Sequence, residues 1–174
     1  MEKYDLLEPD QFYHIYNQGN NGINLFLNAG NYLFFLQRFE KYIVPVAHIY
    51  AYALMPNHFH FLVQIKSNCN EKIASQAFGN LFNSYAKAFN KQQKRSGSLF
   101  RRKFRRKKIE NQQYLNNTLI YIHNNPVNHG YCDDSIEYSW TSYHDYLSNE
   151  STFINKEVAL KWFDGVEEFK EAHC

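Results

Sequence analysis

The sequence predicts an α+β fold, an antiparallel ferredoxin-like or RRM-like sheet in the order βαββαβα with helices packed on it. Short alternating, aromatic-rich runs typical of strands recur along the chain, separated by longer segments with apolar residues at three- and four-residue steps. Of the 174 residues, 44% are hydrophobic and 18% aromatic, which is ample for one core. The length is too small for two ordinary enzyme domains.

The first half of the chain predicts three strands and two helices. Residues 12–16 alternate as a strand, and residues 17–24 form a loop, because their two glycines and four asparagines tolerate positive φ. Asn28 can cap a helix over about 29–42. Two more strands follow at 46–54 and 58–65, joined by a turn at Pro56 and Asn57, and an amphipathic helix runs from Ser67 or Asn70 to about Lys91.

The second half predicts one more strand and one more helix. The strand lies within residues 100–109, and the helix covers 111–123. It should stop at Asn124 or Asn125, because the residue before Pro126 avoids the α conformation. We expect a main domain over residues 1–130 and an acidic, aromatic extension over 131–174 packed on the same domain.

A basic segment stands out between Lys94 and Lys108. It holds nine of the 19 lysines and arginines and no acidic residue, whereas the whole chain has a net charge of only +2. Such a segment predicts a polyanionic partner, the alternative being a solvated loop. The candidate DNA-binding residues are Arg95, Arg101, Arg102, Lys103, Arg105, Arg106, Lys107 and Lys108.

Cysteine usage and the termini point to a cytoplasmic protein. The three cysteines are far apart and form no C-x-x-C pair, which argues against a disulfide framework. The acidic N-terminus lacks the apolar region of a signal peptide. The most apolar stretch, residues 43–55, is too short to cross a bilayer, so no membrane partner is expected.

His58 and His60 form the first candidate site. Side chains two residues apart on a strand share one face, so these imidazoles lie roughly 6.6 Å apart along it and can converge on one cation. The alternative is a pair of ordinary surface histidines.

Tyr121 and Asn125 form the second candidate site. Residues four apart on a helix are neighbours, which places a phenol beside an amide oxygen. A nucleophile next to a metal ligand is one interpretation, and a core tyrosine with a capping asparagine is the other. Tyr114, seven residues earlier on nearly the same face, is an alternative nucleophile.

Together, His58-Phe-His60 within M-P-N-H-x-H and Tyr121-x-x-x-Asn125 before Pro-Val resemble the single-tyrosine HUH transposases. The most similar members are the REP-associated tyrosine transposases, which are related to insertion-sequence transposases, and the resemblance covers about residues 12–147. The chain departs from the family at residues 17–19, where Asn-Gln-Gly replaces the usual arginine.

The resemblance implies an activity. His58, His60 and Asn125 would hold Mg²⁺ or Mn²⁺, and Tyr121 would attack a phosphodiester to give a 5′-phosphotyrosine. The catalytic domain, residues 1–130, would thereby nick and rejoin single-stranded DNA at hairpins. The protein would be nucleoid-associated in the cytoplasm, as a monomer or a homodimer.

A second hypothesis is a non-catalytic RRM-like protein, a domesticated transposase that binds single-stranded nucleic acid with the same aromatic and basic residues. A carboxylate-based nuclease is disfavoured, because Asp5 and Asp10 are the only aspartates before Asp133.

Overall fold

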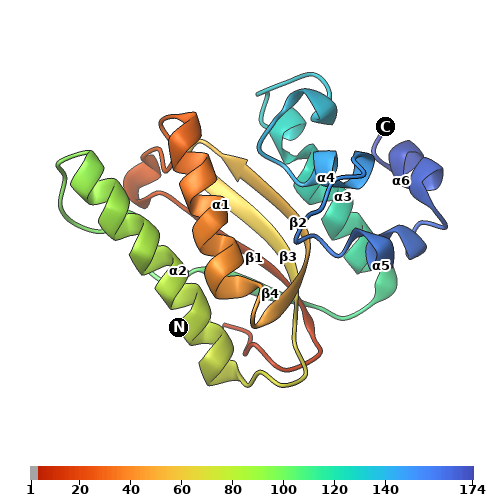
Figure 1. The fold of residues 1–174 in the computed structure, drawn as a ribbon, viewed down its shortest axis with the longest axis horizontal. Helices are drawn as coiled ribbons and strands as arrows, with labels where there is room; N and C mark the ends of the chain where they lie inside the picture. The colour runs from red at the N-terminus through yellow and green to blue at the C-terminus, as the bar shows by residue number, and fades with distance from the viewer. Residues whose placement is uncertain (1–3) are drawn as a thin grey trace.

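The computed structural model describes residues 4–174, and its centre is a four-stranded antiparallel sheet (Figure 1). The strand order is β2-β3-β1-β4, the ferredoxin-like order that the sequence predicts. The strands are β1 (Phe12–Gln18), β2 (Ala47–Met55), β3 (His58–Ile65) and β4 (Arg105–Ile109). The expected loop after residue 16 is therefore shorter, because β1 continues to Gln18 before a 3₁₀ turn, η1 (Asn20–Gly22).

Helices cover both faces of the sheet. On one face lie α1 (Ala29–Ile43) and α2 (Glu71–Gln92), and α3 (Gln112–Asn128) packs on the other, against β2 and β3 (Figure 1). An asparagine side chain caps each of these three helices by accepting a backbone N–H, as expected at Asn28. Of the two starts expected for α2, Ser67 and Asn70, the structure has Asn70.

Side chains along β3 alternate between the hydrophobic core and the opposite face of the sheet. Phe59 and Phe61 are fully buried against the aromatic rings of α1 and α2, for example Phe35. The residues that alternate with them, His58 and His60, therefore face α3. The apolar residues of β3 hold the strand in a register that leaves two imidazoles on the opposite face.

The prediction that α3 stops at Asn124 or Asn125 is wrong, since the helix continues to Asn128 with Pro126 inside it. Pro126 lies in the last turn, where a proline removes one helical hydrogen bond but leaves few others to disturb. Bonds beyond it close the turn: the N–H of His129 donates to Asn125 O at 3.0 Å, and that of Tyr131 to Pro126 O at 2.9 Å. Asn125 thus keeps a helical position facing β3.

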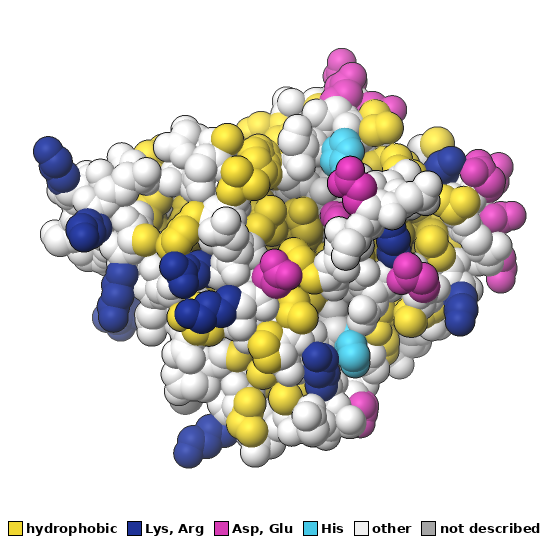
Figure 2. Space-filling view, viewed as in Figure 1, with side chains coloured by type: hydrophobic (Ala, Val, Ile, Leu, Met, Phe, Trp, Pro, Cys, Tyr) yellow, Lys and Arg dark blue, Asp and Glu magenta, His cyan; other side chains and the backbone are white. Residues whose placement is uncertain are grey.

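The C-terminal extension contains η2 (Ser135–Glu137), α4 (Tyr143–Leu147), α5 (Lys156–Lys161) and α6 (Val166–Ala172). It lies along β2, where the Tyr146 hydroxyl donates to Tyr50 O at 2.6 Å and Ile154 bridges to Ile49. Since β2 and β4 are opposite edges of the sheet, the acidic extension lies away from the basic β4. In Figure 2, Lys and Arg gather on the α2 side and Asp and Glu on the side of the C-terminal helices.

Within residues 4–174, no helix has the length and apolar character needed to cross a membrane.

Candidate nucleic-acid cleavage site

Two histidines of β3 form the base of the site. The rings of His58 and His60 stand at 89° to one another with centroids 5.4 Å apart. His58 lies just after the β2–β3 turn, and its Nδ1 is 2.8 Å from Asn57 Oδ1, which orients the ring. His60 is deeper, with 7% of its surface exposed.

Helix α3 brings the second pair of candidate residues to these histidines. Asn125 Oδ1 is 3.1 Å from His58 Nε2, and the Tyr121 ring meets the His60 ring edge-on at 5.6 Å. Tyr121 remains 44% exposed, so a large ligand can reach its hydroxyl. The two sequence motifs, sixty residues apart, therefore meet within one chain.

Two further histidines extend the pair into a row, His14–His60–His58–His129, with successive ring centroids 5.1, 5.4 and 4.7 Å apart. His14 and His129 are not among the site residues that the sequence predicts. His129 lies four residues after Asn125, so helical spacing was an available signal. His14 reaches His60 only through the pairing of β1 with β3, which no local pattern reveals.

His14 and His60 are joined by a hydrogen bond, His14 Nε2 to His60 Nδ1, of 2.9 Å. When the Nδ1–H of His60 donates in this bond, its Nε2 lone pair remains available to a metal. Burial, together with the neighbouring His14, His58 and His129, lowers the pKa of His60 to about 2. Burial, and to a smaller extent the charge of Lys107, lowers the pKa of His14 to about 4. At neutral pH both imidazoles are uncharged, as ligation requires.

The donor set fits a divalent cation only with an amide oxygen included. Among residues 4–174, no group of three or more His, Cys, Asp or Glu side chains is placed to hold a metal ion. Asn125 is fully buried, its Nδ2 has no hydrogen-bond partner, and its Oδ1 faces His58 Nε2 at 3.1 Å. Adjacent ligands of an octahedral ion with bonds of 2.0–2.1 Å are about 3 Å apart, so this spacing suits Mg²⁺ or Mn²⁺.

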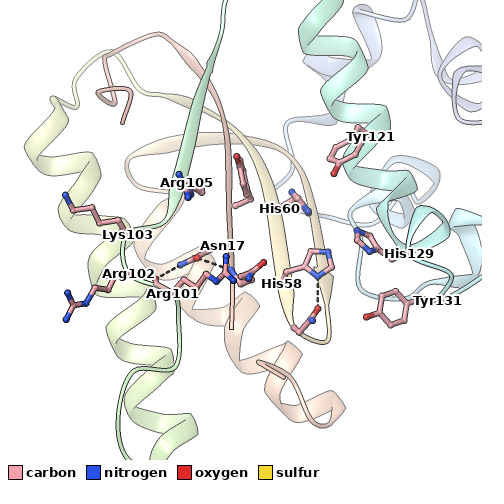
Figure 3. A pocket seen from close by; sticks show the side chains of 13 residues that line it. Asn17, His58, His60, Arg101, Arg102, Lys103, Arg105, Tyr121, His129 and Tyr131 are labelled. Carbon is pink, nitrogen blue, oxygen red and sulfur yellow. Dashed lines mark hydrogen bonds between the residues drawn. The ribbon is translucent and has the colours of Figure 1, made fainter. Parts of the chain in front are cut away.

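His58, His60 and Tyr121 border a cavity of about 570 Å³, hereafter the first cavity (Figure 3). His58 and His60 lie between its two walls. Cationic side chains from the segment leading into β4 line one wall, and residues of α3 and the turn after it line the other (Figure 3). The lining side chains include Arg101, Arg102, Lys103, Arg105, Tyr121 and His129.

Comparison with known proteins identifies the architecture. A family model described as "Transposase IS200 like" matches residues 39–125, half of the chain, including both histidines of β3, Tyr121 and Asn125. The chain belongs to the IS200-like transposase family. A solved structure described as the REP-associated tyrosine transposase bound to a REP hairpin has the same fold, with a TM-score of 0.71 at 16% identity over 86% of this chain and 87% of that one.

A curated relative from Haemophilus influenzae carries the name REP-associated tyrosine transposase. It is 31% identical over 101 aligned residues, and the match covers 54% of this chain and 57% of the relative. The match thus spans little more than half the length of that relative.

The basic side chains of residues 94–108 lie in different places in the fold. Arg101, Arg102, Lys103 and Arg105 border the first cavity, whereas Arg106 and Lys108 do not line it. Arg106 lies 3.6 Å from Glu71 of α2, and Lys108 Nζ is 2.6 Å from Glu8. Arg95 donates to Asn90 Oδ1 at 2.6 Å, and Lys107 faces α3. The structure therefore brings only part of the candidate DNA-binding set to the site.

Arg101 lies beside Gln18, in the Asn-Gln-Gly run at the end of β1. Its guanidinium nitrogens lie 2.7–3.0 Å from the Gln18 side-chain amide, which accepts in its favoured orientation. Asn17 Nδ2 donates to Arg101 O at 3.1 Å. A residue more than eighty positions later thus supplies a guanidinium to the end of β1.

Proposed function

We propose that this transposase nicks and rejoins single-stranded DNA at hairpins, using Tyr121 as nucleophile and a divalent metal at His58, His60 and Asn125. The observation that carries the proposal is the position of Tyr121. An exposed phenol stands edge-on to a buried imidazole, at the border of a cavity lined by cationic side chains. The solved structure of similar fold is described as bound to a REP hairpin, which supports hairpin DNA as the substrate class.

The residues divide the work by chemistry. A bound ion would polarise the P–O bond of the scissile phosphodiester. Guanidinium groups such as Arg101 and Arg102 grip flanking phosphates, and α3 holds the Tyr121 hydroxyl beside the histidines. The 5′-phosphotyrosine preserves the energy of the phosphodiester, so rejoining needs no nucleotide cofactor.

The test of this function is the polarity of a covalent adduct. A single-stranded hairpin oligonucleotide is incubated with the protein and Mn²⁺, with a label on either its 3′ or its 5′ end. Attack by Tyr121 joins the protein to the 5′ phosphate of the downstream fragment. On a denaturing gel we expect the 3′ label to migrate with the protein and the 5′ label to migrate as a shorter fragment with a free 3′-hydroxyl. A non-catalytic binding protein would produce neither species.

DNA binding should depend strongly on salt. If the four cationic side chains of the first cavity and Lys107 neutralise five phosphates, the log–log salt slope for a single strand is roughly −3.5. Affinity then falls about a hundredfold between 50 and 200 mM salt, measured by fluorescence anisotropy.

Single variants apportion that slope. Arg102→Gln should reduce its magnitude by about 0.7, the contribution of one phosphate contact. Lys108→Gln is the matched control, because Lys108 is paired with Glu8 and borders neither the first cavity nor Tyr121. A flat salt response, or equal effects of the two variants, would refute the assignment of the first cavity to DNA.

A further inference from the structure

A second cavity, of about 410 Å³, lies on the other side of Tyr121. It shares Tyr16, His60 and Tyr121 with the first cavity, and it extends between β4 and the N-terminal half of α3. The remaining lining residues are His14, Lys107, Tyr114, Asn117 and Thr118. Because Tyr121 borders both cavities, a ligand that crosses its hydroxyl enters both.

The chemistry of the second cavity suits one unpaired nucleotide. Lys107 Nζ lies 5.5 Å from the centroid of the Tyr114 ring, so a cation and an aromatic surface stand together. The exposed Asn117 adds an amide, and no carboxylate lines the cavity. A lysine contacts phosphate, an aromatic ring stacks on a base, and an amide can bond to the base edge. The volume lies near the lower end of the range for small-ligand sites, about 300–1,000 Å³, which suits a single nucleotide.

Tyr114 is better placed to stack than to attack. Its ring packs beside Lys107 on β4, and it is separated from Tyr121 by two turns of α3. Asn125, the amide that faces His58, is one turn from Tyr121 but three turns from Tyr114. Tyr114 lines the second cavity and not the first, where the cationic wall lies.

We propose that the second cavity is a nucleotide subsite, in which Tyr114 stacks on the base next to the scissile phosphate and Lys107 contacts its phosphate. The proposal rests on the proposed function, because it needs a strand that crosses Tyr121. It adds a second set of contacts, so that the strand is held on both sides of the bond that is cut.

Tyr114→Ala and Tyr114→Phe test the stacking as a matched pair. Binding of the hairpin oligonucleotide is measured by anisotropy without added metal. Tyr114→Ala should weaken binding about 5- to 150-fold, the range for loss of one base stack, whereas Tyr114→Phe, which keeps the ring, should bind like the wild type. Equal losses in both variants would overturn the proposal, since the hydroxyl would then be the group that matters.

Abasic substitutions locate the nucleotide. An abasic site is placed in turn at each unpaired position beside the cleavage site. At one position it should weaken wild-type binding as much as Tyr114→Ala does, and the two changes together should cost no more than either alone. Additive effects at every position would overturn the proposal.

Lys107→Gln provides an independent measurement on an exposed side chain that is not part of the core. It should reduce the magnitude of the salt slope by about 0.7, and an unchanged slope would remove Lys107 from the subsite. Adduct formation by the wild-type protein is scored separately. Its absence with every hairpin would overturn the proposed cleavage function, whereas normal adducts with no effect of Tyr114→Ala would overturn only the subsite.

Discussion

Tyr121→Phe should abolish the covalent protein–DNA adduct and leave DNA binding within about twofold of the wild type. The substitution removes one oxygen and keeps the ring that meets His60 edge-on at 5.6 Å. Because Tyr121 is 44% exposed, loss of its hydroxyl leaves no buried polar partner unsatisfied, and the fold should be unaffected. The remaining cationic residues and the second cavity still hold the strand. We expect loss of adduct to below detection, at least about a thousandfold, since the nucleophile itself is gone.

Tyr114→Phe is the control for that experiment. Both variants lose a phenol oxygen from α3, but only Tyr121 borders both cavities and contacts the His60 ring. Tyr114→Phe should therefore form adducts at close to the wild-type rate on a denaturing gel. Persistent adducts in Tyr121→Phe, lost only when Tyr114 is also changed, would transfer the nucleophilic role to Tyr114.

The sequence predicted the local geometry of the site well because it depends on two short periodicities. A strand places His58 and His60 on one face, and a helix places Asn125 one turn after Tyr121. The structure contains both elements, and β3 has the expected bounds of 58–65. The packing of α3 on the sheet brings the two elements together, and the family resemblance implies this contact where periodicity alone does not.

Features that depend on long-range pairing could not be predicted in the same way. The bond between His14 and His60 exists because β1 pairs with β3 in one register, with Tyr16 opposite His60. The neighbourhood of Arg101 and Gln18 likewise joins segments more than eighty residues apart. Neither contact leaves a signal in the local sequence, since register depends on the whole sheet.

The division of the basic segment was accessible in part. Alternation along β4 places Arg105 and Lys107 on the α3 face and Arg106 and Lys108 on the opposite face, so treating the segment as one patch overlooked the period of a strand. The short helices of the extension gave little signal, because α4, α5 and α6 have only five to seven residues, under two turns.

Loss of a proposed metal ligand should have the second-largest effect. Each of the variants His58→Ala and His60→Ala should weaken Mn²⁺ binding at least about a hundredfold. Loss of a residue that only hydrogen-bonds to a metal ligand already costs 10–100-fold in affinity. Electron paramagnetic resonance of free Mn²⁺ measures this without DNA or catalysis. The matched control is His48→Ala, which removes an exposed histidine from edge strand β2, away from the site. If His48→Ala and His58→Ala weaken binding equally, Mn²⁺ is bound non-specifically by surface histidines.

Substitutions of Asn125 test whether it is a metal ligand or a structural capping residue. Asn125→Leu keeps approximate volume but removes the oxygen that lies 3.1 Å from His58 Nε2, so Mn²⁺ binding should fall as it does in His58→Ala.

Asn125→Asp replaces the amide with a carboxylate, a harder and charged donor that favours Mg²⁺ and Mn²⁺. Without metal this variant places a carboxylate at a fully buried position with only the His58 imidazole beside it, so its melting temperature should fall below that of the wild type. Added Mn²⁺ should raise the melting temperature more in Asn125→Asp than in the wild type, because tighter binding to the folded state stabilises it more. Equal Mn²⁺ affinity in all three proteins would make Asn125 a structural residue and leave the two imidazoles without a third protein ligand.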